Sequence, residues 1–371
     1  MLNLKLKGKK LKVFHNAFKL QGKSFNTVEE ILAFSQEISV DIHSFLTDWF
    51  NENTFITVQT SGSTGKPKVI RLQKENMINS ALATGNYFNL LEKTTALLCM
   101  SPNFIAGKMM LVRAVILGWH LDVVEAVSNP LKNRDLHYDF SAMVPLQLQN
   151  SLDDLHKIKK LIIGGGAVSN ELLNEIQQVK TEIFATYGMT ETISHIAVKK
   201  LNNFTKTLVN ETKQSVYHVF PNISISVDER ICLVIKAPKV SNEIIITNDL
   251  VNIVSETSFE WLGRFDSVIN SGGIKLIPEQ IENKLSSTIS QRFFVAGISD
   301  AVLGEKLILV IEFESVIAEK LKSNMLKKMQ QLKNVSKYEI PKEIYFVEKF
   351  IETPTQKINR TETLKLIKYN D

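Results

Sequence analysis

The sequence contains few cysteines and lacks a long apolar segment. Its two cysteines, Cys99 and Cys232, lie inside short apolar runs, which predicts buried side chains and not a disulfide or a cysteine metal site. The longest apolar region spans 109–119 and is interrupted by Arg113, so we expect no helix that crosses a membrane. The first ten residues are basic, but the continuous apolar stretch of a secretory signal does not follow them. These absences predict a protein of the reducing cytoplasm.

A strong excess of one charge is also missing. The chain has 371 residues, with 44 Lys and Arg against 39 Asp and Glu, so its net charge is only +5. No arginine-rich block or basic–aromatic stripe is present, and we therefore expect no nucleic-acid partner. A mild positive charge is compatible with anionic small molecules. The length favours two domains, although one large α/β unit is an alternative.

Apolar periodicity predicts an α/β protein with a small second domain. Between 74 and 186, expected helices alternate with expected strands, which favours a parallel sheet covered on both faces. The expected helices are 74–88, 105–117, 146–151 and 169–179, and the strands 96–100, 121–124, 141–145, 160–163 and 182–186. Before them we expect a strand pair (2–6 and 11–14) and two helices, 28–35 and 40–50.

After residue 217 the pattern changes. Four short segments, 223–227, 231–236, 243–247 and 251–254, predict an antiparallel sheet or a small barrel-like part. We place a domain boundary near 264–266, giving a first domain of 1–264 and a mobile second domain of 265–371. The second domain is expected to be a small α+β unit with a hairpin at 267–276, helices at 279–287 and 316–332, and strands at 293–297, 307–313 and 344–347.

A loop of small and polar residues is the first candidate site. It combines hydroxyls, glycines and a lysine, in the order Thr60, Ser61, Gly62, Ser63, Thr64, Gly65 and Lys66. Backbone N–H groups, short hydroxyls and positive charge in one loop can hold a polyphosphate. The loop is not a Walker A motif, because Lys66 is followed by Pro67 and not by Ser or Thr. A flexible loop between two strands is the alternative interpretation.

A second candidate follows the strand 182–186. Tyr187-Gly188-Met189-Thr190-Glu191-Thr192 would lie at the carboxyl end of the sheet, where ligands bind in α/β proteins. An aromatic ring can stack on a base, a Thr hydroxyl can donate to a phosphate, and a Glu carboxylate can hold Mg²⁺. Capping of a helix start is the alternative. A nearby turn, Gly164-Gly165-Gly166, lies one residue short of the dinucleotide-binding pattern and is a weak signal alone.

Three further segments carry polar residues at turns. Thr247-Asn248-Asp249 ends an expected strand, and Asp249 could accept two ribose hydroxyls, although an Asx-type turn is the alternative. Gly263-Arg264-Phe265-Asp266 lies at the expected boundary. The segment 354–360, Pro-Thr-Gln-Lys-Ile-Asn-Arg, belongs to a basic tail that could equally be a surface helix.

In this order, the five motifs resemble those of the acyl-adenylate-forming superfamily, which includes acyl-CoA synthetases and adenylation domains. The resemblance covers residues 59–360. It implies that a carboxylate reacts with Mg-ATP to give an acyl-adenylate and pyrophosphate, and that a thiol, here CoA, then takes the acyl group. It also implies that the small domain rotates between the two steps.

The resemblance assigns a role to each candidate residue. Loop 60–66 would bind the phosphates that leave as pyrophosphate, and the 164–166 turn would lie against adenine and acyl group. Tyr187 and Gly188 would contact the nucleotide, Thr190 the α-phosphate and Glu191 the Mg²⁺. The remaining roles are ribose binding by Asp249 and Arg264, a hinge at Asp266, CoA binding by Gly272, Gly273 and Lys275, and catalysis by Lys357, whose ammonium would bridge the carboxylate oxygen and the α-phosphate.

The sequence departs from the family pattern in three places. Asn248 and Gln356 stand where the family usually has Gly, and only 58 residues precede the phosphate motif, fewer than in typical members. The trimmed beginning puts CoA and oligomer contacts in doubt, and a homodimer is one of the open possibilities. Intact Glu191, Asp249, Arg264 and Lys357 argue against a non-catalytic descendant.

The segments 101–110, 141–148 and 187–197 most resemble the o-succinylbenzoate–CoA ligases of menaquinone synthesis. This resemblance implies an aromatic substrate with two carboxylates, an aromatic gate at Phe104, and a pocket wall that includes Ser194 and His195. Arg113 and Lys108 could neutralise the second carboxylate, but we favour a role as helix-surface charges. The alternatives are another aryl- or acyl-CoA ligase and an enzyme that charges a carrier protein.

Overall fold

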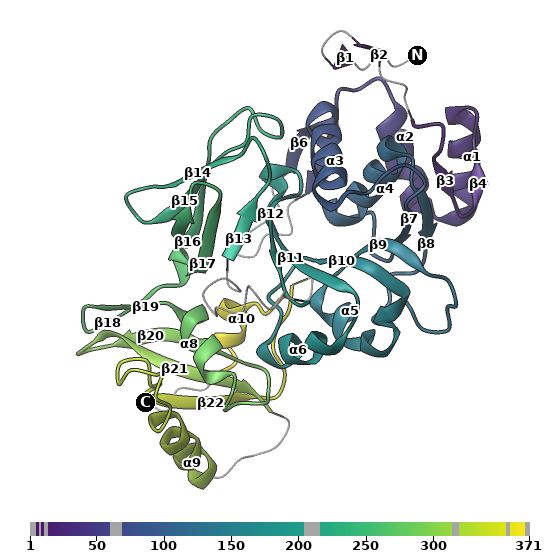
Figure 1. The fold of residues 1–371 in the computed structure, drawn as a ribbon. Helices are drawn as coiled ribbons and strands as arrows, with labels where there is room; N and C mark the ends of the chain where they lie inside the picture. Colours follow the sequence, from purple (N-terminus) through teal and green to yellow (C-terminus); the bar gives the residue numbers. More distant parts are fainter. Residues whose placement is uncertain are drawn as a thin grey trace.

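The computed structural model describes residues 5–6, 9–10, 14–59, 69–203, 216–313, 319–353 and 357–367. The predicted phosphate loop at 60–66 and the stretch 354–356 lie outside the described residues. A large part of the protein holds a 13-stranded sheet flanked by helices, and a smaller part holds a five-stranded sheet (Figure 1). The expected α/β fold class with a small α+β part is confirmed.

Five adjacent strands in the middle of the large sheet run parallel. In sheet order they are β8 (His120–Val123), β7 (Thr95–Leu98), β9 (Tyr138–Met143), β10 (Ile158–Ile163) and β11 (Glu182–Gly188). Beyond β8 the sheet ends in β3 (Lys19–Leu20) and β4 (Lys23–Ser24), which the sequence patterns did not predict. A strand pair is present near the start, β1 (Lys5–Leu6) and β2 (Lys9–Lys10). The first lies within the predicted strand 2–6, but β2 ends before the predicted strand 11–14, of which only Phe14 is described, outside any strand.

Helices cover both faces of the parallel strands, as expected. On β7, Ala96 and Leu98 join one hydrophobic core, whereas Leu97 between them joins another on the opposite face. Such alternation with apolar residues on both faces is typical of a parallel sheet buried between helices. The first core includes α1 (Val28–Ile38), α2 (Val40–Phe50), α3 (Lys74–Phe88) and α4 (Ile105–Leu117), and the second α5 (Pro145–Asn150), η1 (Leu152–Lys157), α6 (Asn170–Glu175) and η2 (Ile176–Gln178).

The antiparallel part does not form a separate barrel, because its strands continue the large sheet beyond β11. These strands are β12 (His195–Lys200), β13 (Val216–Val219), β17 (Ser258–Arg264), β16 (Ile245–Ser255), β15 (Cys232–Lys236) and β14 (Ser224–Val227). The two strands predicted at 243–247 and 251–254 are one continuous strand, β16, and this prediction was wrong. Asp249 therefore lies inside a strand, directly opposite Arg264 of β17.

A separate antiparallel hairpin precedes α3. It consists of β5 (Phe55–Gln59) and β6 (Val69–Gln73), and Gln59 pairs with Val69 at the end that the connecting loop joins. The predicted phosphate loop connects these two residues, so the hairpin determines where the loop leaves and re-enters the fold.

The smaller part is built on β21 (Gly304–Glu312), which pairs with β20 (Phe293–Asp300), β22 (Glu343–Val347) and β18 (Ile269–Ser271). Its other elements are η5 (Phe265–Ser267), β19 (Ile274–Leu276), α8 (Pro278–Leu285), α9 (Glu319–Gln330) and α10 (Arg360–Leu364). Its two hydrophobic cores contain only residues from 269 onward. This separation agrees with a boundary at 264/265, which itself stays a prediction.

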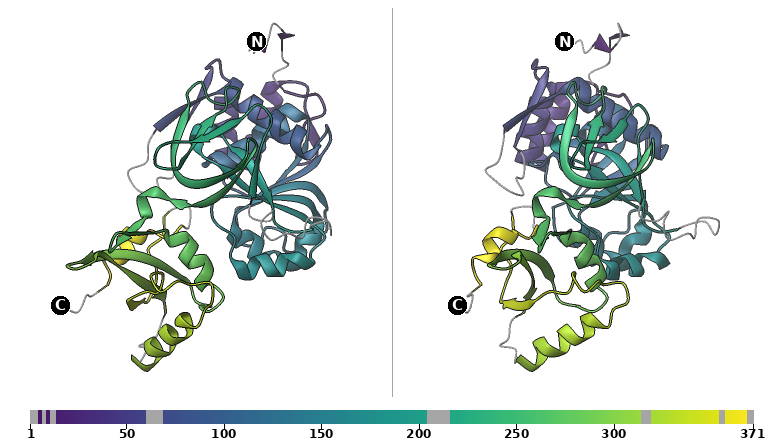
Figure 2. Two further views of the ribbon diagram at one scale, coloured as in Figure 1. Left: turned by 60° about the vertical axis from the view of Figure 1, so that its left-hand side comes forward. Right: turned by 90° about the vertical axis from the view of Figure 1, so that its left-hand side faces the viewer.

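The two parts meet along α6 and α8. Asn170 Nδ2 donates to Asn283 Oδ1 at 2.8 Å and to Ser286 Oγ at 2.6 Å. Figures 1 and 2 show α10 on the side of the smaller part that is turned toward the large sheet.

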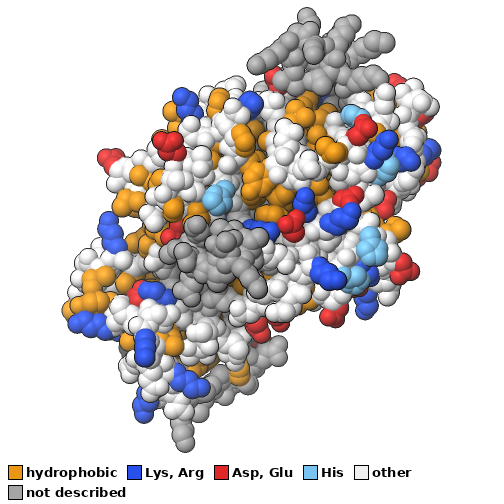
Figure 3. All heavy atoms as spheres, viewed as in Figure 1, with side chains coloured by type: hydrophobic (Ala, Val, Ile, Leu, Met, Phe, Trp, Pro, Cys, Tyr) orange, Lys and Arg blue, Asp and Glu red, His pale blue; other side chains and the backbone are white. Residues whose placement is uncertain are grey.

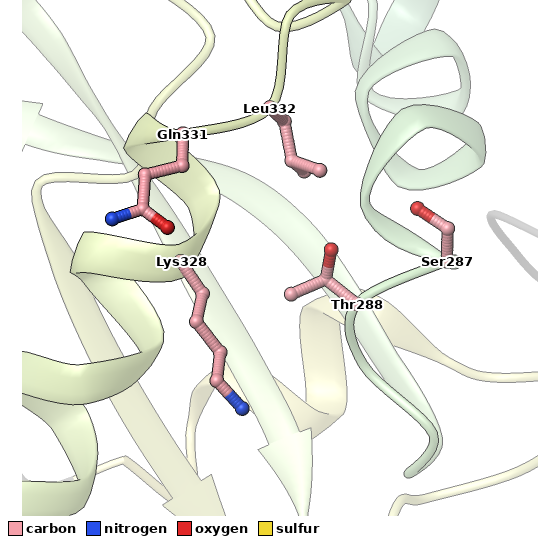
Figure 4. Close-up of a pocket in the computed structure, with 5 residues that line it drawn as sticks. All are labelled: Ser287, Thr288, Lys328, Gln331 and Leu332. Carbon is pink, nitrogen blue, oxygen red and sulfur yellow. The ribbon is translucent and has the colours of Figure 1, made fainter.

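The surface adds little to the functional argument. In the described part of the chain, no helix is long and apolar enough to span a membrane. Basic and acidic side chains are interspersed on the face shown in Figure 3. A pocket between α8 and α9 is lined by Ser287, Thr288, Lys328, Gln331 and Leu332 (Figure 4), none of which is a predicted site residue.

Gly118, which ends α4, gives a testable prediction about the fold. Its φ is +74°, and an added Cβ would lie 2.3 Å from Nδ1 of His15. Gly22 has nearly the same φ, +75°, with no atom within 4 Å of an added Cβ. We expect Gly22→Ala to lower the free energy of unfolding by about 1–2 kcal/mol through backbone strain alone. Gly118→Ala should lower it clearly more, as measured by urea unfolding, because the added Cβ also meets His15.

Equal losses of stability in the two variants would show that the His15 contact is unimportant. Removal of the His15 side chain by His15→Ala should restore stability to Gly118→Ala but not to Gly22→Ala.

Candidate functional site

The carboxyl ends of β10 and β11 form the base of the site. The chain leaves β10 through Gly164, whose added Cβ would lie 2.9 Å from Oγ1 of Thr186, and Gly165 has a φ of +84°. Thr186 Oγ1 donates to the carbonyl of Ile163 at 2.9 Å. The glycine turn and the Tyr187 motif, predicted separately, are therefore neighbours at the edge where α/β sheets bind ligands.

A buried carboxylate organises the next part of the site. Asp249 is only 8% exposed, and its Oδ2 accepts a 2.6 Å hydrogen bond from the hydroxyl of Tyr187. Its Oδ1 accepts from Nε1 of Trp261 at 3.2 Å and lies 3.7 Å from Nη1 of Arg264. Three residues from two strands, β11 and β17, thus converge on one carboxylate, which keeps lone pairs for further donors.

Trp261 was missed by the sequence analysis. It lies on β17 opposite Val251 of β16, and only the continuous pairing of these strands brings its indole to Asp249. The nearby Arg264 motif was the available signal, but an isolated Trp in an apolar strand is more often a packing residue.

Tyr187 supports the carboxylate from a crowded aromatic cluster. Its ring contacts those of Tyr217 and Phe259 edge-on, with centroids 5.8 and 5.0 Å away. Burial, and then the charge of Asp249, raise the pKa of Tyr187 well above its ordinary value. The phenol is therefore a neutral hydrogen-bond donor, and its predicted contact with adenine stays a prediction.

Arg264 links the predicted ribose site to the predicted hinge. Its Nε and Nη2 donate to the two carboxylate oxygens of Asp266 at 3.0 and 2.7 Å. This bidentate hydrogen bonding is the first cause of a lowered pKa at Asp266. The guanidinium of Arg264 is thus held by Asp266 through Nε and Nη2, while its Nη1 faces Asp249.

Lys357 lies within electrostatic range of the same pair. Its surface is partly open to solvent, yet nearby protein atoms remove hydration, and this is the largest cause of its lowered pKa. The positive charge of Arg264 lowers the pKa further, whereas Asp249 raises it. The structure thus brings the residue predicted as catalytic to the predicted ribose site; its role stays a prediction.

The turn after Tyr187 is unusually tight. An added Cβ at Gly188 would lie 2.3 Å from the carbonyl oxygen of Ser194, so no other residue fits there. Ile193 has a φ of +67°, and Ser194 N donates to the carbonyl of Thr192 at 2.7 Å. A γ-turn with positive φ at a β-branched residue is strained, which is a feature of functional sites.

This turn separates two groups of residues. Thr192 is buried and binds backbone on both sides of the turn, while Thr190 is half-buried and Glu191 exposed. Within the described chain, Glu191 has no ion-pair partner, and no cluster of three metal-binding side chains is present. A single free carboxylate suits Mg²⁺, which is usually held by one or two carboxylates together with substrate phosphates.

Beyond the turn, Ser194 and His195 point to a buried arginine. Arg113 is 2% exposed, and its Nη2 donates to Ser194 Oγ at 2.7 Å. Ser194 Oγ also contacts Nδ1 of His195 at 3.2 Å, and Thr84 Oγ1 lies 3.4 Å from its Nε2. The favoured interpretation of Arg113 as a helix-surface charge was wrong, because α4 is buried on nearly all sides.

This cluster holds a positive charge that no neighbouring carboxylate of the described chain balances. Among the described residues, Arg113 has no carboxylate partner, and its Nε is buried without a hydrogen bond. Burial lowers the pKa of Arg113 to about 9, so it remains charged at neutral pH. Burial, then the charge of Arg113, hold the pKa of His195 well below its ordinary value, which leaves that ring neutral.

The remaining predicted residues lie elsewhere. Lys108 is half-buried and donates to the carbonyl of Pro102 at 2.7 Å, so it too is no free surface charge. Phe104 precedes α4 and is 42% exposed.

Gly272 and Gly273 form the β18–β19 turn with φ of +60° and +81°, and Lys275 is exposed on β19. Their predicted roles in binding CoA, and that of Phe104 at the acyl group, stay predictions.

The charges around Lys357 predict how its pKa responds to substitution. We expect Arg264→Gln to raise the pKa of Lys357, because a repelling cation is removed, and Asp249→Asn to lower it, because an attracting anion is removed. Reductive ¹³C-methylation followed by NMR titration measures this value, and the signal that Lys357→Arg removes identifies the residue. A Lys357 pKa equal to that of the bulk lysine signal and insensitive to both substitutions would contradict the geometry.

Comparisons with known proteins identify the family of this chain. The family model described as "AMP-binding enzyme" matches residues 25–247. A 2-succinylbenzoate–CoA ligase of Geobacillus sp. is 26% identical over 93% of this chain and 75% of that protein. A Listeria innocua protein of the same name is 28% identical over 85% of this chain and 70% of its own length.

Solved structures agree with the fold. An acyl-CoA synthetase (AMP-forming)/AMP-acid ligase II-like protein from Dyadobacter fermentans is 37% identical, with a TM-score of 0.57 over 88% of this chain and 95% of that chain. The o-succinylbenzoate CoA synthetase of Bacillus subtilis, in complex with its acyl-adenylate intermediate, has a TM-score of 0.71 at 21% identity and covers 85% of this chain and 69% of that one. With a family model that spans more than half of its residues, the chain belongs to the AMP-binding enzyme family.

Proposed function

We propose that the protein is an AMP-forming acyl-CoA ligase whose acid is o-succinylbenzoate. In the first step, a carboxylate oxygen of the acid attacks the α-phosphorus of ATP, and the bond from that phosphorus to the bridging oxygen breaks, so pyrophosphate leaves. In the second step, the CoA thiolate attacks the acyl carbon and AMP leaves as a thioester forms. The family membership and the ligase names of the relatives support this reaction class.

The described residues suit the nucleotide half of this reaction. Asp249, held by Tyr187 and Trp261, would accept the ribose hydroxyls, and Arg264 lies beside it. Lys357 would stabilise the charge that develops on the α-phosphate and on the attacking oxygen. Glu191 would bind Mg²⁺, which neutralises phosphate charge when bound. ATP, the acid and CoA are the small-molecule substrates.

The buried Arg113 carries the proposal for the acid. A guanidinium without a counter-charge is costly inside a protein, and anionic ligands remove that cost. Ser194 adds a hydroxyl beside it, and His195, being neutral, leaves Arg113 as the only cation of the cluster. An acid with a second carboxylate, which does not react, would satisfy this charge. The names of the relatives point to such a substrate.

A substrate panel tests the proposal. Purified protein with Mg-ATP and CoA is given o-succinylbenzoate, analogues in which either carboxylate is replaced by an amide, benzoate, and aliphatic acids. Pyrophosphate and thioester are measured separately. We expect o-succinylbenzoate to be turned over fastest. Turnover only with other acids would contradict the substrate, and no turnover with any acid would contradict the enzymatic function. A pantetheinyl carrier protein in place of CoA tests the alternative acceptor.

A variant of Arg113 tests the role of the second carboxylate. Losing one partner of a buried ion pair costs about 3–5 kcal/mol, so Arg113→Met should lower kcat/KM for o-succinylbenzoate by about a hundredfold or more. The same change should hardly affect an analogue that lacks the non-reacting carboxylate. Lys365→Gln, which breaks an exposed ion pair with Glu362, is the control. An equal loss for both substrates would mean that Arg113 serves only the fold.

A further inference from the structure

Lys357 lies on one of two segments, 351–353 and 357–359, which backbone hydrogen bonds join as the two legs of a hairpin. Asn359 N donates to the carbonyl of Ile351 at 2.7 Å, and Thr353 N donates to the carbonyl of Lys357 at 2.8 Å. Thr353 also accepts, through Oγ1, from the backbone N–H of Lys357 at 3.1 Å. These bonds shape the hairpin locally, but they do not determine where it points.

The second leg is attached to the smaller part by Arg360, three residues after Lys357. Nη2 of Arg360 donates to Glu282 Oε2 of α8 at 2.9 Å, and the guanidinium lies 5.7 Å from the ring of Phe294. Glu282 is held in turn, because its Oε1 accepts from the backbone N–H of Val295 at 2.9 Å. Both side chains are mostly buried, with 31% and 19% exposure, so the pair is worth more than a surface ion pair.

The same arginine is connected to the hinge. Nη2 of Arg360 lies 4.0 Å from Oε1 of Glu279, one turn before Glu282 on α8. That oxygen accepts a 3.0 Å hydrogen bond from Ser267 Oγ, immediately after Asp266. An added Cβ at Gly263 would lie 2.5 Å from the other oxygen of Glu279. Two carboxylates of one helix therefore contact both the hinge and the hairpin of Lys357.

The first leg has a weaker attachment. Glu352 forms an ion pair with Arg292, which also pairs with Glu312 at 3.0 Å. Arg292 is 49% exposed, so water screens these contacts more strongly than those of Arg360. The position of the hairpin depends mainly on its second leg.

From these contacts we infer that Arg360 and Glu282 are positioning residues, which hold the hairpin so that Lys357 is presented beside Asp249 and Arg264 for the first chemical step. This inference rests on the proposed function and adds residues to it. Neither side chain touches the substrates in this account. Each acts through Lys357, and the link through Glu279 ties the presentation of Lys357 to the orientation of the hinge.

Two half-reactions separate this role from a general effect on the fold. With o-succinylbenzoate, or with the best acid of the panel, Arg360→Gln should lower the rate of pyrophosphate formation about 10- to 100-fold, as expected for a misplaced catalytic group. The KM for ATP should change less than about threefold, since the ribose site is intact. Thioester formation from preformed acyl-adenylate should stay close to wild type.

Matched variants strengthen the test. Glu282→Gln keeps an acceptor for Val295 but removes the charge, and it should reproduce the kinetic effect if Arg360→Gln does not fold. Arg360→Lys should give an intermediate rate of pyrophosphate formation, because lysine keeps the positive charge but lacks the several fixed N–H donors of a guanidinium. In a Lys357→Ala background, Arg360→Gln should cause no further loss. Lys365→Gln, directly after the short helix that begins at Arg360, is the control for a removed surface charge.

The outcomes distinguish this inference from the proposed function. A wild type without turnover contradicts the proposed function alone, and the methylated Lys357 then still reports the positioning: Arg360→Gln should move its pKa toward the ordinary lysine value, while Lys365→Gln should not. In an active enzyme, equal losses in both half-reactions, or a full further loss in the Lys357→Ala background, would overturn the inference. So would an unchanged Lys357 signal in Arg360→Gln.

Discussion

The pairing of β16 with β17 is the constraint on which the candidate site depends. It places Asp249 directly opposite Arg264, and it brings the indole of Trp261 to the same carboxylate. The hydroxyl of Tyr187 reaches Asp249 from the end of the parallel strands. A carboxylate with three such neighbours cannot shift without breaking these contacts, so this part of the candidate site is rigid before a ligand arrives. Because Arg264 also holds Asp266, the same pairing anchors the start of the smaller part.

Among the described residues, buried charges are paired in one part of the candidate site and unpaired in another. Near Asp249 the charges are paired, and the site is complete within the protein. At Arg113 the charge is unpaired in the described chain, and the cost of burying it is balanced only when an anion binds. Under the proposed function, the first arrangement would provide a stable frame for the nucleotide, and the second would provide selectivity for an acid with two carboxylates. The strained turn at Ile193 separates Thr190 and Glu191 from Ser194 along the chain.

Much of the fold could be read from periodicity. The helices 74–88 and 105–117 match α3 and α4, because continuous apolar patterns and a clear Gly118 end determine such elements locally. The division of β16 into two strands was wrong because Asn248 and Asp249 are typical turn residues, and only the pairing partners keep them extended. Arg113 was misjudged for a related reason: the sequence shows a cation in a helix, but burial depends on what packs around that helix.

The sequence by itself determined the order of the motifs, the chemistry that each residue type can perform, and hence the family, since these depend only on side-chain identity and spacing. The tertiary structure alone decided which of these residues share a site. Trp261 joins Asp249 through strand register, Arg113 of the buried helix α4 meets Ser194 just before β12, and Arg360 reaches Glu282 through the fold of the smaller part. Each contact joins residues whose separation along the chain carries no information about distance, because the register and packing that unite them are set by the whole fold.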